Sequence, residues 1–271
     1  MMPTTEPAAA RPASGCKHHH QLQTAPQPKC ACQGLLRPRR MHALCGLWMA
    51  CFLAAHLAIG ATGWSPAAYR SNIDAIQGAL AHVPGFTLLA VFAPLLFQAS
   101  SGLYLLRKEG MKYNVKKCNR GGKLRFFAQR ATGLALLAFA LFHVATLHAW
   151  GLHAVCRATH LGALNRYADG GLFQAGGAAF RSTADGFGRF CGAWTAGNAL
   201  VAVLSLLGVW ATAFHAANGA WSGGVIWGLA SAQESKRRWG YVCAAMGIAL
   251  LALGTAAWCA FTLSDSARRL R

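Results

Sequence analysis

Residues 126–150 read FFAQRATGLALLAFALFHVATLHAW, a run in which Arg130, near its start, is the only residue with a formal charge. About 20 consecutive apolar residues are enough for a helix to cross the hydrocarbon core of a bilayer. His143 lies deep in this run, and a histidine inside a membrane span is rare and usually functional. The stretch therefore predicts a membrane-spanning helix that carries a functional group.

Four further apolar segments have a similar length and character, and they cover residues 41–60, 86–106, 194–221 and 241–263. Of the 271 residues, 55% are hydrophobic and 12% are charged. A soluble domain carries about a quarter charged residues. The sequence thus predicts an all-α fold, a transmembrane bundle of five helices.

The net charge of +19 raises the alternative of a nucleic-acid-binding protein. However, the Lys and Arg residues cluster between the apolar segments, as in loops at a membrane face. No basic stripe interleaved with aromatic residues is present in the sequence. We therefore expect membrane lipid, and no nucleic acid, as a partner. Most of the 26 Lys and Arg residues precede the first segment or lie in the second and fourth connections, which places the N-terminus in the cytoplasm.

The chain divides into three parts by composition. Residues 1–38 are rich in Pro, Ala and Gln without hydrophobic periodicity, which predicts a disordered cytoplasmic tail. The five-helix transmembrane domain is expected over 39–265, and a short basic C-terminal tail over 266–271. The tail holds His18–His20 and three cysteines, so a metal-binding tail and a solvated low-complexity arm are the alternatives.

The longest connection runs from about residue 151 to residue 190, and Cys156 and Cys191 lie at its two ends. The orientation above places this loop in the outer compartment. Two cysteines in an oxidising compartment can form a disulfide, and two free thiols are the alternative.

The depths of the histidines predict which of them meet. At a rise of 1.5 Å per residue, His56 lies about 24 Å past Arg40 and His143 about 20 Å past Arg130, both measured from the inner face. His56 and His143 therefore lie in the outer half of the membrane, where they can bind one haem iron from both sides. We expect the first four helices to surround this haem-binding interior. The fifth helix is expected to be peripheral, because no charged residue or histidine occurs within it.

A second pair of residues is expected near the inner face. His215 lies on the fourth helix, which descends from the outer side, and Gln98 lies at a matching depth on the second helix. Glutamine is a poor haem ligand compared with histidine, methionine or cysteine. The predicted metal ligands are therefore His56, His143 and His215.

Five stretches of the sequence resemble one known family. They are RMHALCG (40–46), FLAAHLAIG (52–60), APLLFQASSGLYL (93–105), FFAQRATGLALLAFALFHV (126–144) and FHAANGAWSGGVIWGLASAQESKRR (214–238). The family is the single-chain, five-helix, dihaem cytochrome b membrane anchor of succinate dehydrogenase and fumarate reductase. The stretches cover the first four helices in the expected order, and the last two stretches are the most specific.

The resemblance implies a place in the bacterial cytoplasmic membrane, with a flavoprotein subunit and an iron–sulfur subunit on the cytoplasmic side. It implies that electrons pass through haem b between the iron–sulfur subunit and a membrane quinone, commonly menaquinone. The family's outer haem ligands fall on His56 and His143, and its inner ligands fall on Gln98 and His215. Since the family has histidine where this chain has Gln98, the inner site is empty, five-coordinate through His215, or completed by another side chain. His42 is expected at the inner membrane edge, where it would be a poor substitute.

Four polar residues fit supporting roles at the inner face. Gln129 and Arg130 begin the third helix, and Arg40 and His42 begin the first. They are expected to contact haem propionates or a quinone oxygen. An ordinary positive-inside anchor explains Arg130 equally well.

The sequence contains no glycine-rich dinucleotide motif and no nucleophile–base constellation. We therefore expect an electron-transfer subunit that is not catalytic toward succinate on its own. Two other functions stay open: a haem b quinol-oxidising subunit of another respiratory complex, and a haem-free membrane scaffold.

Overall fold

The computed structural model describes residues 37–111, 120–148, 176–189 and 196–264. These residues belong to one compact unit that begins at Arg37. The described part of the chain is helical and contains no strand. It has five helical segments long and apolar enough to cross a membrane, which confirms the predicted count. The segments are Pro38–Trp64, Leu88–Glu109, Leu124–Ala145, Ala199–Ile226 and Gln233–Thr262.

Shorter elements accompany the spans. In chain order the elements are α2 (Pro38–Ala61), the 3-10 turn η1 (Thr62–Trp64), α3 (Pro66–Ala81), the π-helical turn η2 (Leu88–Phe92), α4 (Ala93–Glu109), α5 (Arg120–His148), η4 (Gly176–Ala178), α7 (Ala179–Ala184), η5 (Asp185–Arg189), α8 (Ala196–Ile226) and α9 (Gln233–Thr262).

The helix ends follow ordinary capping chemistry. Pro38 occupies the first turn of α2, where its missing N–H costs nothing, so this helix begins inside the predicted tail. The Ser65 hydroxyl caps α3 by accepting a hydrogen bond from the Ala68 backbone N–H. Gly110 ends α4 with a φ of +73°, a conformation that glycine adopts without strain.

The fifth span begins earlier than expected. We predicted a loop up to residue 240, but α9 begins at Gln233 and includes the basic residues Lys236, Arg237 and Arg238. The Glu234 carboxylate and the Arg238 guanidinium form an ion pair across one turn, at 2.6 Å. A hydropathy pattern does not detect these polar turns, because the helix continues beyond the hydrocarbon region.

A proline shapes the start of α4. Pro94 lacks the N–H that would bond to the Ala90 carbonyl one turn earlier. The indole N–H of Trp48 on α2 donates to that carbonyl instead, at 2.7 Å. The Cys45 thiol donates to the Pro94 carbonyl at 3.2 Å. These two hydrogen bonds attach the π-helical turn η2 and the first turn of α4 to α2.

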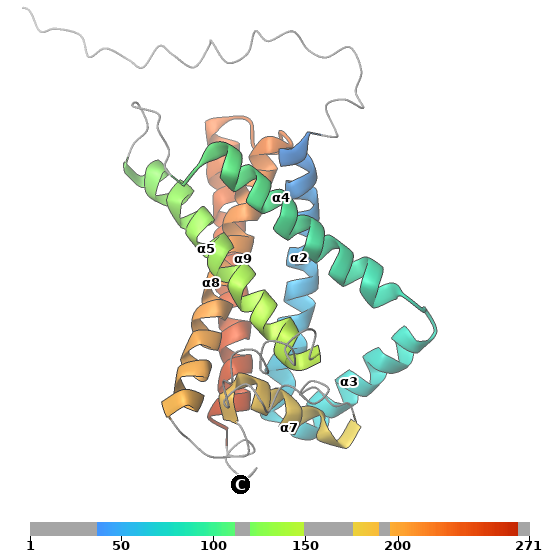
Figure 1. The fold of residues 1–271 in the computed structure, drawn as a ribbon. Coiled ribbons are helices and arrows are strands. Elements are labelled where there is room, and N and C mark those ends of the chain that lie inside the picture. Colours follow the sequence, from blue (N-terminus) through green and yellow to red (C-terminus); the bar gives the residue numbers. More distant parts are fainter. Residues whose placement is uncertain (1–36, 112–119, 149–175, 190–195, 265–271) are drawn as a thin grey trace, which may run out of the picture. The chain divides into compact units, whose positions relative to one another are not determined.

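Helices α2, α8 and α9 form the densest part of the unit, and α5 packs along α8 (Figure 1). Leu57, Ala213 and Leu250 meet in a buried core between α2, α8 and α9. Gly254 on α9 allows this close approach, because a Cβ there would press against Leu57 and Val209. The prediction that the fifth span is peripheral is therefore wrong, because α9 packs along both α2 and α8, although none of the described hydrogen bonds to the histidines comes from it.

Helices α4 and α5 are packed more loosely. No residue is buried in the most apolar 18-residue window of either span, whereas 33% of that window is buried in α8.

One end of the unit carries helices that the sequence did not predict. The stretch over 61–85 was expected to be a loop but contains α3, whose Tyr69 packs against Phe261 at the end of α9, with ring centroids 5.0 Å apart. Tyr69 also shares a hydrogen bond with Thr183 of α7, at 3.0 Å. Burial raises the pKa of the Tyr69 phenol. Helix α7 and η5 likewise lie where only a long loop was expected.

Candidate haem-binding histidines

The predicted outer ligands do meet. The rings of His56 on α2 and His143 on α5 have centroids 6.1 Å apart and planes at 84°. An imidazole nitrogen binds a metal at about 2.0 Å, so two rings that share one metal have centroids roughly 6 Å apart. Axial imidazoles can rotate about the line through the metal, so perpendicular planes are compatible with this. The same separation also suits a metal-free edge-to-face ring contact.

The surroundings of His56 favour a ligand. No described residue makes a hydrogen bond to the His56 ring, and its ring neighbours are Phe52, at 5.6 Å, and His143. The His56 side chain is exposed, so its ring is accessible to a bound group. Unpartnered ring nitrogens in a membrane interior are costly, and a metal bond would offset that cost.

A second group of histidines lies toward the end of the bundle where α2 and α9 begin, which we call the basic end. Residue 133 of α5, which contacts His215, precedes His143 by ten positions, or about 15 Å of helix. The two groups therefore occupy two levels. We call the second one the inner level; it contains His42, Gln98, Gln129 and His215.

Gln98 is bonded to His42. The Ser101 hydroxyl donates its proton to the Phe97 carbonyl at 2.6 Å, so the His42 Nδ1–H must donate to Ser101, at 2.8 Å. The His42 Nε2 is then an acceptor, and the Gln98 amide donates to it at 3.2 Å. His42 thus lies against Gln98. We had expected His42 to lie apart from Gln98, at the inner membrane edge. The Gln98 Oε1 is buried and lacks a partner among the described residues.

His215 is held by Gln129 of α5. The His215 Nδ1–H donates to the Gln129 backbone carbonyl at 3.1 Å, and the Gln129 amide donates to the His215 Nε2 at 3.3 Å. An Nδ1–H bonded to a carbonyl is the usual support of a metal-binding histidine. A Cβ at position 133 would come within 2.9 Å of the His215 ring, so Gly133 provides the space that the ring occupies.

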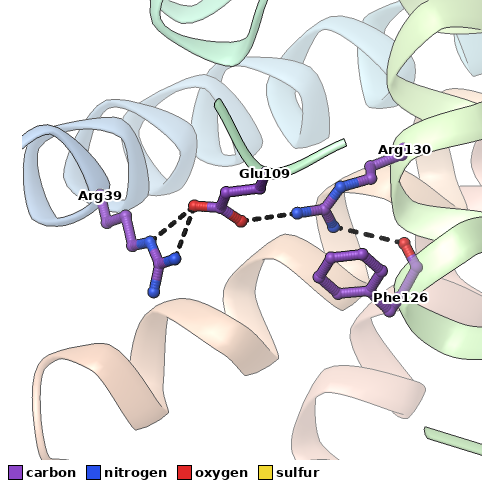
Figure 2. Close-up of polar contacts among 4 residues, drawn as sticks. All are labelled: Arg39, Glu109, Phe126 and Arg130. Atoms are coloured by element: carbon purple, nitrogen blue, oxygen red, sulfur yellow. Dashed lines mark hydrogen bonds and ion pairs between the residues drawn. The ribbon is translucent and has the colours of Figure 1, made fainter. Parts of the chain in front are cut away.

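Arg130 has an acidic partner that the sequence analysis missed. Its guanidinium bonds to Glu109 at 2.6 Å, and Glu109 also bonds to Arg39 at 2.7 Å (Figure 2). The Arg130 guanidinium lies over the Phe126 ring, 3.2 Å from its centroid, and its Nε is buried without a partner among the described residues. The single carboxylate therefore joins α2, α4 and α5. Glu109 is one of only seven acidic residues, and that rarity was the available signal.

Arg40 is directed elsewhere. Its guanidinium lies 5.6 Å from the ring centroid of Trp227, beyond the end of α8. Asn218, one turn after His215, donates to the Gln129 side chain at 2.6 Å and accepts from Arg125. Arg125 also stacks on Trp221. A network of polar side chains thus connects His215 to the basic end.

Within the described ranges, no three His, Cys, Asp or Glu residues gather as a multi-ligand metal site. A haem needs only two axial protein ligands, because its macrocycle supplies the other four. The predictions for His18–His20, for Cys156 and for Cys191 lie outside the described residues, as do the C-terminal residues 266–271 and nearly all of the predicted tail. Comparisons of the chain with protein-family models, with curated proteins and with solved structures gave no match.

Proposed function

We propose that this chain is the membrane-anchor cytochrome b subunit of a succinate:quinone oxidoreductase, a succinate dehydrogenase or fumarate reductase. In this function, electrons pass through haem b between an iron–sulfur subunit and a membrane quinone. The observation that carries the proposal is the meeting of His56 and His143, from two different spans, at a ring separation that suits one shared metal.

The proposed roles of the residues follow from their positions. His56 and His143 would hold haem b, which supplies one-electron transfer when bound. Phe52 and Phe139 pack beside these two rings, at 5.6 and 5.7 Å, and limit their rotation. The spans that contain α4 and α5 have no buried residue in their most apolar windows, so the side chains of these two helices can adjust to a bound cofactor.

At the inner level we propose that Gln98 prevents the usual pair of histidine ligands. His215 has the supporting bond of a metal ligand, but Gln98 can offer only an amide opposite it. His42 presents an Nε2 lone pair toward Gln98, so it is the nearest side chain that could complete the site. A five-coordinate site through His215 and an empty site are the other arrangements.

We place the basic end in the cytoplasm of a bacterium, facing the flavoprotein and iron–sulfur subunits. The support is charge: the helix ends gathered there carry Arg39, Arg40 and Arg130, and α9 adds three more cations. Cations near a soluble electron-transfer partner favour its docking through acidic surface groups. The quinone, of menaquinone type in this proposal, would approach from the membrane between the loosely packed spans.

A purification from native membranes tests this function. Tagged full-length chain should bring down a subunit with covalently bound flavin and a subunit with iron–sulfur clusters, and the complex should reduce quinone with succinate. A matched purification of the His82→Ala variant should behave identically, because His82 lies at the end of α3, outside the spans. Recovery of a haem-containing chain with a different dehydrogenase would contradict the proposal and favour another respiratory complex.

A further inference from the structure

A pocket of about 1080 Å³ opens at the basic end, between the early turns of α5 and α9 and the later turns of α8. None of the histidines lines it. Its lining combines cations with an apolar surface: Arg125, Lys236 and Arg237 supply the charge, and Trp221, Tyr241 and Ala244 supply the apolar part. A lining that is both cationic and apolar suits an amphipathic ligand, one with an anionic group and an apolar part, better than it suits water alone.

The cations of the pocket are available for an anion. Arg125 is oriented by its bond to the Asn218 side chain and by stacking on Trp221, 3.7 Å from the ring centroid. Lys236 and Arg237 form no ion pair among the described residues. The one acid in the lining, Glu234, is already paired with Arg238 at 2.6 Å. The pocket therefore has a net positive charge, which suits an anionic group with several oxygen atoms such as a phosphodiester.

The walls of the pocket are fixed by close helix packing. The Trp239 indole lies against Gly224 of α8 and donates to the Ala220 carbonyl at 3.2 Å. A Cβ at Gly240 would be at an ordinary van der Waals distance of 3.6 Å from the Trp221 indole, so α9 lies directly against this wall of the pocket. These contacts hold α8 and α9 at a constant spacing, and the pocket is preformed.

The position of the pocket identifies the source of the phosphodiester. It lies near the end of the α8 span and the start of the α9 span, where we expect lipid headgroups, and Tyr241 is an aromatic residue of the kind enriched at that interface. Ala244 lies one turn farther along α9, toward the hydrocarbon, so the apolar lining continues in the direction of an acyl chain. Free phosphate would use only the charged part. We propose that this pocket binds an anionic phospholipid, with its headgroup on Arg125, Lys236 and Arg237 and an acyl chain along α9.

Lipid binding to the purified full-length chain in a neutral detergent tests the proposal. Native mass spectrometry should show dioleoyl phosphatidylglycerol retained at about 1:1, at least about 10-fold more tightly than dioleoyl phosphatidylcholine. The Lys236→Gln/Arg237→Gln variant should lose about 10-fold or more in affinity for phosphatidylglycerol. Arg107→Gln/Lys108→Gln is the matched control, because it removes two cations from the end of α4, outside the pocket lining, and should keep the affinity.

A second variant separates shape from charge. Ala244→Trp leaves the charge unchanged but fills the apolar part of the pocket, and it should also reduce phosphatidylglycerol retention. Four results would overturn the proposal: equal retention of the two lipids, equal losses in the two double variants, unchanged retention in Ala244→Trp, or full displacement of the lipid by millimolar sodium phosphate. The last result would indicate a site for free anions.

Discussion

At the scale of single residues, Gln98 is the residue that we propose limits the chain to one haem. Replacing Gln98 with histidine places an imidazole at the position that we expect for the partner of His215, which Gln129 already supports. We expect Gln98→His to add a second low-spin haem b to the one held by His56 and His143. The haem-to-protein ratio and the reduced-minus-oxidised spectrum measure this, with Gln98→Leu as the control that adds none. An unchanged haem-to-protein ratio in Gln98→His would show that residues besides Gln98 also prevent haem from binding at the inner level.

Glu109 is the second residue whose replacement has a calculable consequence. Its carboxylate is 20% exposed and neutralises Arg130, whose side chain is 14% exposed. Because this pair is only partly buried, removing one partner costs about 1–3 kcal/mol, the cost of leaving the other charged group without its hydrogen bond. We expect Glu109→Gln to lower the free energy of unfolding by about that amount, seen as a lower thermal midpoint in detergent.

Arg39 provides the matched control for Glu109. It bonds to the same carboxylate, but its side chain is 65% exposed. An exposed ion pair contributes about 0–1 kcal/mol. Arg39→Gln should therefore change the thermal midpoint little, and equal effects of the two substitutions would contradict a partly buried ion pair between Glu109 and Arg130.

At the scale of elements, the close packing of α9 depends on a glycine. Gly254→Val would bring side-chain atoms against Leu57 and Val209 at the point where α2, α8 and α9 meet. Overpacking a dense site costs about 1–3 kcal/mol, so we expect a lower thermal midpoint. Gly78→Ala is the control: it lies on α3 with open space around it, and should stabilise the helix by about 0.5–1 kcal/mol. Full stability of Gly254→Val would contradict the packing described here.

The helices also show how much of the fold and of the candidate site could be predicted from the sequence. Hydropathy located all five spans, because the hydrocarbon core demands long apolar helices whatever their neighbours. It missed α3 and the first turns of α9, since polar helical turns outside the hydrocarbon have no such signal. Helical rise predicted the meeting of His56 with His143, because both belong to long regular helices. It failed for His42, whose contact with Gln98 depends on how α2 and α4 cross and not on depth.

At the scale of the whole molecule, the five spans found among the described residues lead us to expect the two ends of the chain on opposite sides of the membrane. The cations of the basic end predict a cytoplasmic N-terminus. A green fluorescent protein fused before residue 1 should fluoresce, and a phosphatase fused after residue 271 should be active outside the cytoplasm. The reverse pattern would contradict the orientation and the proposed docking of soluble subunits at the basic end.

We propose above that His56 and His143 hold one haem b between α2 and α5. The most direct test of this proposal is the haem-to-protein ratio of the purified full-length chain, with reduced-minus-oxidised spectra, for the wild type, His56→Ala, His143→Ala and the control His82→Ala. The account predicts about one haem b per chain for the wild type and the control, and loss of that haem in both span variants. A folded wild-type chain without a haem b band, or a band that survives in His56→Ala and His143→Ala, would contradict it.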